Sequence, residues 1–410
     1  MKTFQPELFK CMKSYSKKQL VNDIIAGIIV AIIALPLSIA LALASGVNPE
    51  QGLYTAIVAG AVIAFMGGSR VQISGPTAAF ATIVAGVVAE NGMEGLVAAT
   101  VMAGIFLIIM GVLRCGSLIK FIPYTITTGF TAGIAVTIVI GQLKDFFGLT
   151  FTHSPVETME KLEEVIATFG TFNMSAMLVG LMALAILILW PMLPGFFKKI
   201  PPSLIAVVAA AAVVKLGGLD VNTIGDLYTI SNKPPMPSIP SFSFDTIKTV
   251  IPDAFTIAVL AAVESLLSCV VADGMTGTKH NSNTELIAQG AGNICSALFG
   301  GIPATGAIAR TAANIKNGGR TPVAGIVHAI VLLLILVVLM PYAALIPMPA
   351  IAAVLFVVAY NMSEWRHFVD LAKTAPKSDI TVLVVTFLLT VIFDLLLLYV
   401  QVLYLRQYSL

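Results

Sequence analysis

The 410-residue chain has little charge and few cysteines. Charged residues make up 11% of it and hydrophobic residues 58%, whereas soluble domains contain about 25% charged residues. This composition excludes a soluble globular fold, and it excludes disorder because so apolar a chain cannot stay solvated. The four cysteines have no regular spacing, which excludes a disulfide scaffold. The remaining class is an integral membrane protein.

Motifs of membrane-bound enzymes are also missing. Residues 274–280 come nearest to a phosphate-binding loop but lack its Gly-Lys pair, so we expect no ATP hydrolysis. The sequence has no His-Glu-x-x-His pair and no cysteine cluster that would indicate a metal centre. We therefore expect no enzyme activity, no cofactor, no metal and no nucleic-acid partner.

Long apolar runs, each of about 20 residues, recur along the chain and predict membrane-spanning helices. We expect an all-α membrane protein with fourteen spans, at residues 22–46, 51–67, 73–90, 94–113, 120–143, 173–194, 201–217, 248–271, 284–299, 303–316, 321–341, 347–361, 378–394 and 395–410.

The positions of Lys and Arg predict the orientation. Residues 1–21 carry five lysines but no cleavage site, so we interpret them as a cytoplasmic segment rather than a signal peptide. With this segment inside, seventeen Lys and Arg residues fall on the inner side and five on the outer side, which predicts two cytoplasmic termini. Among the outer segments, residues 144–172 contain glutamates that suggest a short surface helix.

The chain repeats itself weakly at an offset of about 230 residues. Residues 74–79 and residues 303–307 each interrupt an apolar run, at matching places in the two halves. We expect two seven-span repeats, 22–217 and 248–410, joined by an extracytoplasmic loop at 218–247. Since seven is odd, the second repeat must be inverted. Inverted repeats with one broken helix each are typical of secondary transporters, whose substrate binds near the membrane midplane.

The two breaks predict an anion site. Proline disfavours helix in the residue before it, so we expect Ser74 and Gly75 to be extended and helices to start near Pro76 and Pro303. Each start leaves free N–H groups and a positive dipole end where an anion can bind. The alternative is that both breaks are packing kinks. The candidate binding residues are Ser74, Gly75, Thr77, Ala78, Ala79, Thr305, Gly306 and Ala307.

Ionisable residues inside the predicted spans are functional candidates, because each costs about 2.5–3.5 kcal/mol or more at mid-depth. Glu264 stands alone in the run 255–271 and is either a structural carboxyl bonded to neighbouring serines or a coupling-ion site. Arg310, which we expect two turns beyond its helix start, either holds the charge of an anion or extends to the inner surface. We expect His328 to be a hydrogen-bonded packing residue rather than a proton relay.

Several motifs of the chain resemble the sulfate permease family of anion transporters. They are ALPLS at 34–38, GGSR at 67–70 followed by SGPTAA at 74–79, ESLLS at 264–268 leading to DGMTGTKH at 273–280, and ARTAAN at 309–314. The resemblance covers about residues 20–394 and looks closest to bacterial members that take up C4-dicarboxylic acids, with bicarbonate and sulfate carriers as cousins.

The resemblance implies a fold and roles for individual residues. Spans 1–4 and 8–11 would form a core domain that carries substrate by an elevator motion, and spans 5–7 and 12–14 a gate domain with a dimer contact. Arg310 falls where animal relatives hold a charge near the anion, and Glu264 and Ser268 fall where sodium-coupled relatives place ion ligands. Glutamate instead of aspartate at position 264 favours a proton over sodium. The regulatory (STAS) domain that usually follows is expected to be absent.

The sequence therefore predicts a secondary active transporter in a bacterial inner membrane. We expect a homodimer in the lipid bilayer that moves a C4-dicarboxylate, sulfate or bicarbonate with a proton, or else sodium, as coupling ion. Two alternatives stay open. One is a nucleobase or ascorbate carrier of the same fold, although span ten offers Thr305 and Gly306 instead of the carboxylate such carriers use. The other is an anion channel, although the few charges do not form a pore-lining ring.

Overall fold

The computed structural model describes residues 4–117, 124–153, 155, 157–194, 200–238 and 244–393. The chain divides into two compact units, each assembled from separated parts of the sequence. Unit 1 consists of Met1–Phe80, Val87–Lys120 and Thr229–Tyr342, and unit 2 of Ala81–Gly86, Phe121–Tyr228 and Ala343–Leu410. Unit 1 thus combines most of predicted spans 1–4 with spans 8–11.

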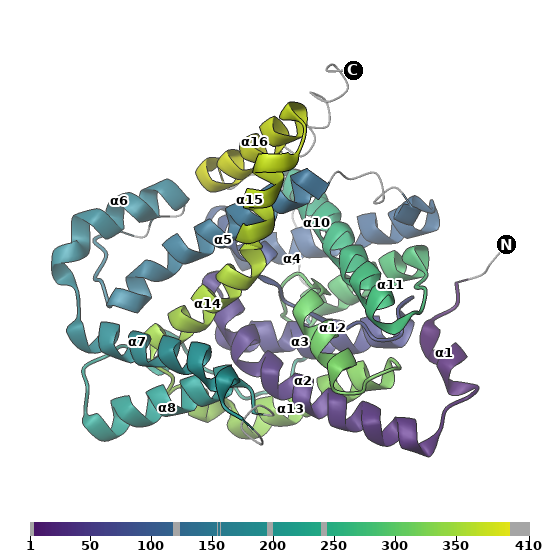
Figure 1. Cartoon of the computed structure of the whole chain (residues 1–410), viewed down its shortest axis with the longest axis horizontal. Helices are drawn as coiled ribbons and strands as arrows, with labels where there is room; N and C mark the ends of the chain where they lie inside the picture. Colours follow the sequence, from purple (N-terminus) through teal and green to yellow (C-terminus); the bar gives the residue numbers. More distant parts are fainter. Residues whose placement is uncertain are drawn as a thin grey trace. The chain divides into compact units, whose positions relative to one another are not determined.

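Unit 1 contains eight α-helices, one short 3-10 helix and two short strands among the described residues, and Figure 1 labels the helices. In chain order these elements are α1 (Glu7–Met12), α2 (Lys17–Ala44), α3 (Pro49–Met66), β1 (Ser74–Gly75), η1 (Ala78–Phe80), α4 (Ala81–Val112), α10 (Phe244–Thr276), α11 (Ser282–Leu298), β2 (Thr305–Gly306), α12 (Ile308–Lys316) and α13 (Val323–Ala343). The first six residues of α4 belong to unit 2.

The described elements of unit 2 are all helices, and α14 packs against both α5 and α7 (Figure 1). Its elements are α5 (Tyr124–Phe147), α6 (Thr158–Thr168), η3 (Phe169–Thr171), α7 (Met174–Leu189), η4 (Trp190–Met192), α8 (Pro202–Gly217), α9 (Ile224–Leu227), α14 (Met348–Ser363), α15 (Trp365–Thr374) and α16 (Lys377–Phe393). The short helix predicted within 144–172 is confirmed as α6. Helix α15 was not predicted, because it is amphipathic and a search for apolar runs passes over it.

Local sequence explains where several helices begin. Ser16 precedes α2 and its Oγ accepts a hydrogen bond from the Gln19 N–H (3.1 Å). Asn281 caps α11 by accepting from the Thr284 N–H (3.2 Å), and Asn173 caps α7 in the same way. A side-chain oxygen at this position satisfies an N–H that has no partner inside the helix.

Eight helices in the described part of the chain are long and apolar enough to cross a membrane. Helices α8, α11, α12 and α16 are shorter, so the total of fourteen spans stays a prediction. The predicted span 395–410 and the opening residues 120–123 of another lie outside the described residues. Helix α4 is interrupted at Gly92 (φ 66°), which agrees with the predicted division between spans 73–90 and 94–113.

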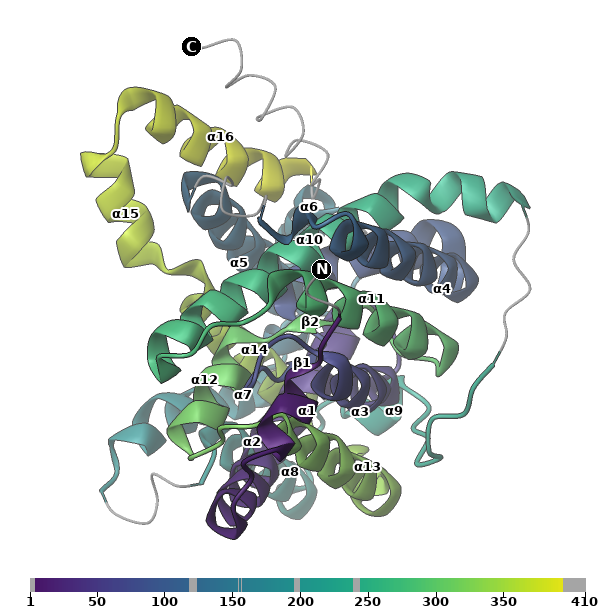
Figure 2. The ribbon, with the colours of Figure 1, turned by 90° about the vertical axis from the view of Figure 1, so that its right-hand side faces the viewer.

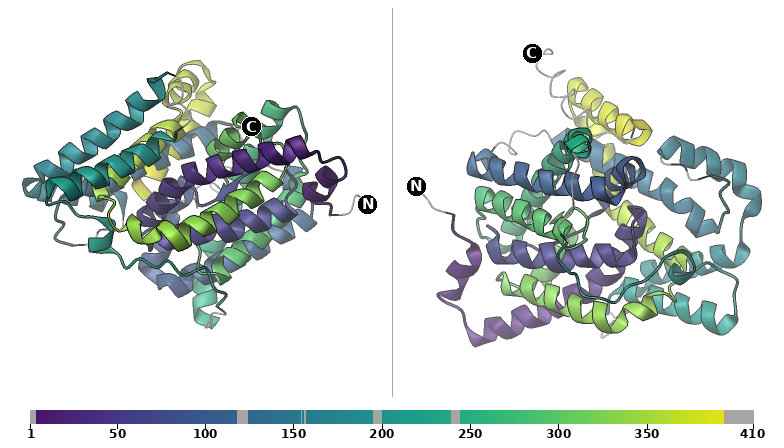
Figure 3. Two further views of the ribbon diagram at one scale, coloured as in Figure 1. Left: turned by 90° about the horizontal axis from the view of Figure 1, so that it is seen from below. Right: turned by 180° about the vertical axis from the view of Figure 1, so that it is seen from behind.

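Small residues let the helices of unit 1 approach closely. A Cβ atom on Gly104 of α4 would lie 2.6 Å from the carbonyl oxygen of Gly290 on α11, and one on Gly290 would lie 2.4 Å from the oxygen of Gly104. A Cβ on Gly27 of α2 would lie 2.6 Å from the Ala324 oxygen of α13, and these two helices run side by side in Figure 3. Such backbone contact is typical of helix packing in membranes.

Candidate substrate site

The two predicted breaks meet inside unit 1. Strand β1 pairs with β2 in an antiparallel sheet, with Ser74 opposite Gly306 and Gly75 opposite Thr305 (Figure 2). All four residues are buried. The prediction that Ser74 and Gly75 are extended is confirmed. The sheet joins segments more than 200 positions apart in sequence, so it brings the starts of η1 and α12 to one place.

The predicted helix start near Pro303 is wrong, because α12 begins only at Ile308. The backbone on both sides of Pro303 is bonded elsewhere. The Ile302 N–H donates to Thr55 Oγ1 (2.7 Å), and Asn293 holds residue 304 from both sides, accepting from its N–H (2.8 Å) and donating to its carbonyl (2.9 Å). Pairing of β2 with β1 then uses the next two residues. The first helical turn after Pro76 likewise begins late, at Ala78.

Arg310 lies in the first turn of α12, not two turns beyond its start as predicted, because the helix begins so late. Its side chain is 3% exposed, so the interpretation that it extends to the membrane surface is wrong. Nη2 donates to the Pro76 carbonyl (3.0 Å). Nη1 is buried without a hydrogen-bond partner, and the guanidinium forms no ion pair with any described residue. A buried cation in this state favours a bound anion, because an uncompensated charge in low dielectric is costly.

Small residues surround the two helix starts. Ala78, Ala79 and Ala307 are all buried. The Ala307 N–H donates to the Ile73 carbonyl (2.9 Å), so the N–H groups of α12 that have no partner within the helix begin at Ile308. The predicted residues at both breaks therefore lie together, and the late start of α12 shifts its free donors toward Arg310.

Glu264 on α10 contacts the first break. Thr77 Oγ1 donates to its Oε2 (2.8 Å), and the side chain is partly exposed. Thr305 of the second break donates to the carbonyl of Ala261, also on α10 (3.0 Å). The interpretation of Glu264 as a carboxyl bonded to neighbouring serines is wrong, because Ser265 donates to the Ala261 carbonyl instead.

Ser268, one turn after Glu264 on the same helix, has a different partner. Its Oγ donates to Thr311 Oγ1 of α12 (3.3 Å), and that oxygen also accepts from the Ile73 N–H (3.0 Å). Helix α10 thus contacts the first break through Glu264, the second break through the Ala261 carbonyl, and α12 through Ser268. The role of this pair as an ion site stays a prediction.

A polar face of α11, which the sequence argument missed, supports the sheet from behind. Glu285 is fully buried and accepts hydrogen bonds from the Gly68 N–H (2.8 Å), Gln72 Nε2 (2.8 Å) and Gln289 Nε2 (2.9 Å). Gln289 Nε2 also donates to Ser74 Oγ of β1 (3.2 Å). The spacing of Glu285, Gln289 and Asn293 at i, i+4 and i+8 within an apolar segment was the available signal, since these positions share one helix face.

His328 on α13 is fully buried, and neither ring nitrogen has a hydrogen-bond partner among the described residues. The expectation of a hydrogen-bonded packing residue is therefore not met there. No group of three or more His, Cys, Asp and Glu side chains within the described ranges could hold a metal ion.

Comparison with known proteins identifies the family. The model of the sulfate permease family matches residues 20–386. The chain belongs to the sulfate permease family. It is 42% identical over 386 residues to YvdB of Bacillus subtilis, which is named as a candidate sulfate transporter, covering 94% of this chain and 72% of YvdB. It is 34% identical over 388 residues to the bicarbonate transporter BicA of Picosynechococcus sp., covering 92% of this chain and 67% of BicA.

Solved structures agree with this assignment. The transmembrane domain of a cyanobacterial bicarbonate transporter BicA superposes with a TM-score of 0.82 at 32% identity, covering 92% of this chain and 96% of that one. Murine Solute Carrier 26 family member A9, an anion transporter, shares the fold with a TM-score of 0.85 at 20% identity, covering 95% of this chain and 68% of the other. The predictions of an all-helical membrane transporter that is not an enzyme are confirmed.

Proposed function

We propose that the chain is a secondary active transporter that binds a small anion where β1 and β2 bring the starts of η1 and α12 together. The observation that carries the proposal is Arg310, buried with Nη1 unpartnered and with no described carboxylate paired to it. The free N–H groups of two helix starts add donors and positive dipole ends beside this charge. A nearly neutral nucleobase would leave the guanidinium uncompensated.

Charge balance ranks the candidate substrates. A monoanion such as bicarbonate neutralises Arg310 when Glu264 is protonated, so the loaded site carries no net charge. Sulfate or a C4-dicarboxylate would leave one negative charge, which a second proton or a sodium ion must balance before the site crosses a low-dielectric slab. We therefore rank bicarbonate as the best-fitting substrate, ahead of sulfate and C4-dicarboxylates. Names of the relatives support the first two anions.

The transport cycle we propose is an elevator. Unit 1 contains the whole candidate site and would carry the anion, while unit 2 would stay in the bilayer and form a homodimer contact. Glu264 would bind the coupling proton, since its carboxyl already meets the first break through Thr77. The protein would lie in the bacterial inner membrane with cytoplasmic termini.

Uptake into proteoliposomes tests the proposal. Labelled bicarbonate, sulfate and succinate are supplied separately, with and without an inward proton or sodium gradient. We expect saturable uptake of at least one anion, and a rise in KM of about tenfold or more when Arg310→Met removes the charge, as expected for loss of a charge-assisted contact. Arg366→Met, which removes an exposed arginine of α15, is the control.

Two outcomes would contradict the proposal. An unchanged KM in Arg310→Met would show that the anion does not bind at α12. Non-saturating currents far above carrier turnover, with no exchange against anion on the opposite side, would indicate a channel.

A further inference from the structure

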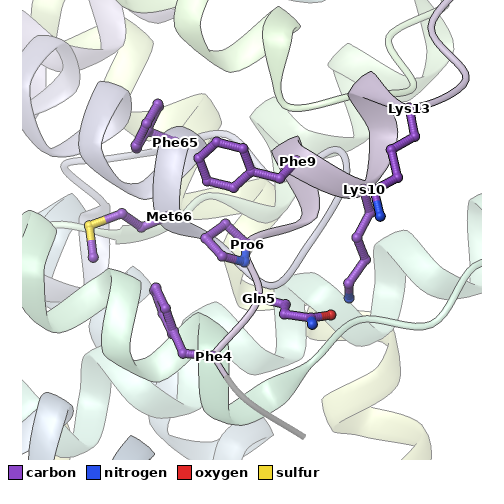
Figure 4. Close-up of a pocket in the computed structure, with 8 residues that line it drawn as sticks. All are labelled: Phe4, Gln5, Pro6, Phe9, Lys10, Lys13, Phe65 and Met66. Carbon is purple, nitrogen blue, oxygen red and sulfur yellow. The ribbon is translucent and has the colours of Figure 1, made fainter.

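Helix α1 packs against the end of α3, where Figure 4 shows a surface cavity. The Glu7 N–H donates to the Gly67 carbonyl (2.9 Å), and its carboxylate accepts from Arg70 Nε (3.1 Å). The rings of Phe9 and Phe65 meet edge to face with centroids 5.6 Å apart. Leu8 and Cys11 are buried on the inner side of α1. The cavity walls are therefore held in place by unit 1.

The cavity, of about 520 Å³, has an apolar wall and a basic rim. Figure 4 shows Phe4, Pro6, Phe9, Phe65 and Met66 around the space, with lysines extending from the α1 side. Phe9 is 54% exposed and Phe65 49% exposed. Neighbouring exposed aromatic rings on a defined cavity mark a surface that binds apolar groups.

The cavity lies at a membrane boundary. Helices α2 and α3 are consecutive candidate spans joined by a short turn, so they cross in opposite directions. The start of α2 and the end of α3 therefore lie at the same membrane face, and the cavity is next to both. Exposed phenylalanines at this depth contact the boundary between headgroups and acyl chains.

The rim has excess positive charge. Glu7 is the one carboxylate within α1, and it pairs with both Lys10 and Arg70. Lys13 is exposed and forms no ion pair with any described residue, and Lys17 and Lys18 follow at the start of α2. Basic residues beside a membrane surface attract anionic lipid headgroups.

We propose that this cavity binds an anionic phospholipid of the adjoining leaflet. An acyl chain lies against Phe9, Phe65 and Met66, and the headgroup phosphate contacts Lys10 and Lys13. Free phosphate would make no use of the aromatic wall, and an uncharged lipid would make no use of the lysines. The site is separate from the anion site at β1 and β2.

Quenching by brominated lipids tests this site. Phe9→Trp is introduced into a chain whose own tryptophans are replaced (Trp190→Phe, Trp365→Phe), and the full-length protein is reconstituted in phosphatidylcholine with phosphatidylglycerol. Either lipid is brominated in turn. We expect brominated phosphatidylglycerol to occupy the site about thirtyfold more strongly than brominated phosphatidylcholine, given two lysines near the surface.

Charge variants then identify the rim. The double variant Lys10→Gln, Lys13→Gln should reduce the ratio of phosphatidylglycerol to phosphatidylcholine occupancy to about one. Lys13→Gln alone leaves the Glu7 ion pairs intact and should reduce this ratio partly. Lys215→Gln with Lys233→Gln makes the same charge change elsewhere and should leave the preference unaltered.

Three results would overturn the lipid site. The first is that the chain with all its lysines binds both lipids equally, and the second is that it still prefers phosphatidylglycerol after both rim lysines are replaced. The third is that added inorganic phosphate abolishes the preference for phosphatidylglycerol, whereas chloride at equal ionic strength does not.

Discussion

Gly75 and Arg310 lie so close that a Cβ atom on residue 75 would be 2.5 Å from the Nη1 atom of Arg310. Real Cβ atoms essentially never approach a heavy atom so closely, so the guanidinium can keep its place only while residue 75 has no side chain. The same Nη1 is the donor without a partner. Gly75 at the first break therefore makes room for the charge of Arg310, which follows the second break.

Replacing Gly75 with alanine should displace Arg310 and weaken anion binding. We expect KM for uptake to rise by about tenfold, the effect of losing roughly 1.4 kcal/mol of binding free energy. Gly86→Ala is the matched control, because a Cβ there has no heavy atom within 4 Å. Uptake kinetics in proteoliposomes measure both variants. Equal KM values in the two would show that Arg310 does not need the space at residue 75.

Replacing Gly306 with leucine should abolish transport while the protein still inserts. A leucine side chain there would fill the space where we propose that the anion meets the helix start. The structure adds a second cause, because a Cβ on Gly306 would lie 2.2 Å from Gln72 Nε2, whose hydrogen bond to Glu285 supports β1. Gly141→Leu, at a position with open space, should transport normally. Uptake and size-exclusion profiles are compared, and wild-type uptake in Gly306→Leu would remove the site from β2.

Replacing Glu264 with glutamine should uncouple transport from the proton gradient. Glutamine mimics the protonated carboxyl and can keep the hydrogen bond to Thr77. The variant should still exchange anion across the membrane but lose acceleration by an inward proton gradient. The control is Glu94→Gln, because Glu94 is exposed. Full proton-driven accumulation in Glu264→Gln would defeat the assignment, and sodium stimulation of the wild type at fixed pH would favour a cation held by Glu264 and Ser268.

Acid should remove a stabilising contact from the surface helix α6. The side chain and N–H of Thr152 both donate to Glu164 Oε1, and these hydrogen bonds lower the pKa of Glu164. A carboxyl with a lowered pKa in the folded state contributes stability above its unfolded pKa, about 4.3, and loses it as pH falls through the folded value. Thr152→Val should therefore lower Tm near neutral pH but much less well below pH 4.

Thermal unfolding of detergent-solubilised protein measures this difference. Thr150→Val is the control, because the structure gives the Thr150 side chain no bond to Glu164. A Tm loss in Thr152→Val that is equally large at both pH values would assign the effect to packing rather than to the charge of Glu164.

The sequence predicted most elements whose cause is local. Apolar runs place the long helices because a spanning segment must bury its surface in lipid and satisfy its own backbone. The strand at Ser74 and Gly75 was predictable because Pro76 restricts the residue before it. The polar positions of α11 could also have been found, since Glu285, Gln289 and Asn293 repeat at helical spacing.

Only the tertiary structure decided where the second break ends and what Arg310 does. Proline at 303 permits a helix start, but side chains of other helices hold the backbone on both sides of it. Thr55 bonds residue 302, Asn293 bonds residue 304, and β1 pairs with the next residues. The start of α12 then moves to Ile308, which puts Arg310 in the first turn, facing Gly75 and Pro76. Thr55, Gly75 and Pro76 lie more than 200 residues along the chain from the groups that they contact, and no local propensity encodes such contacts.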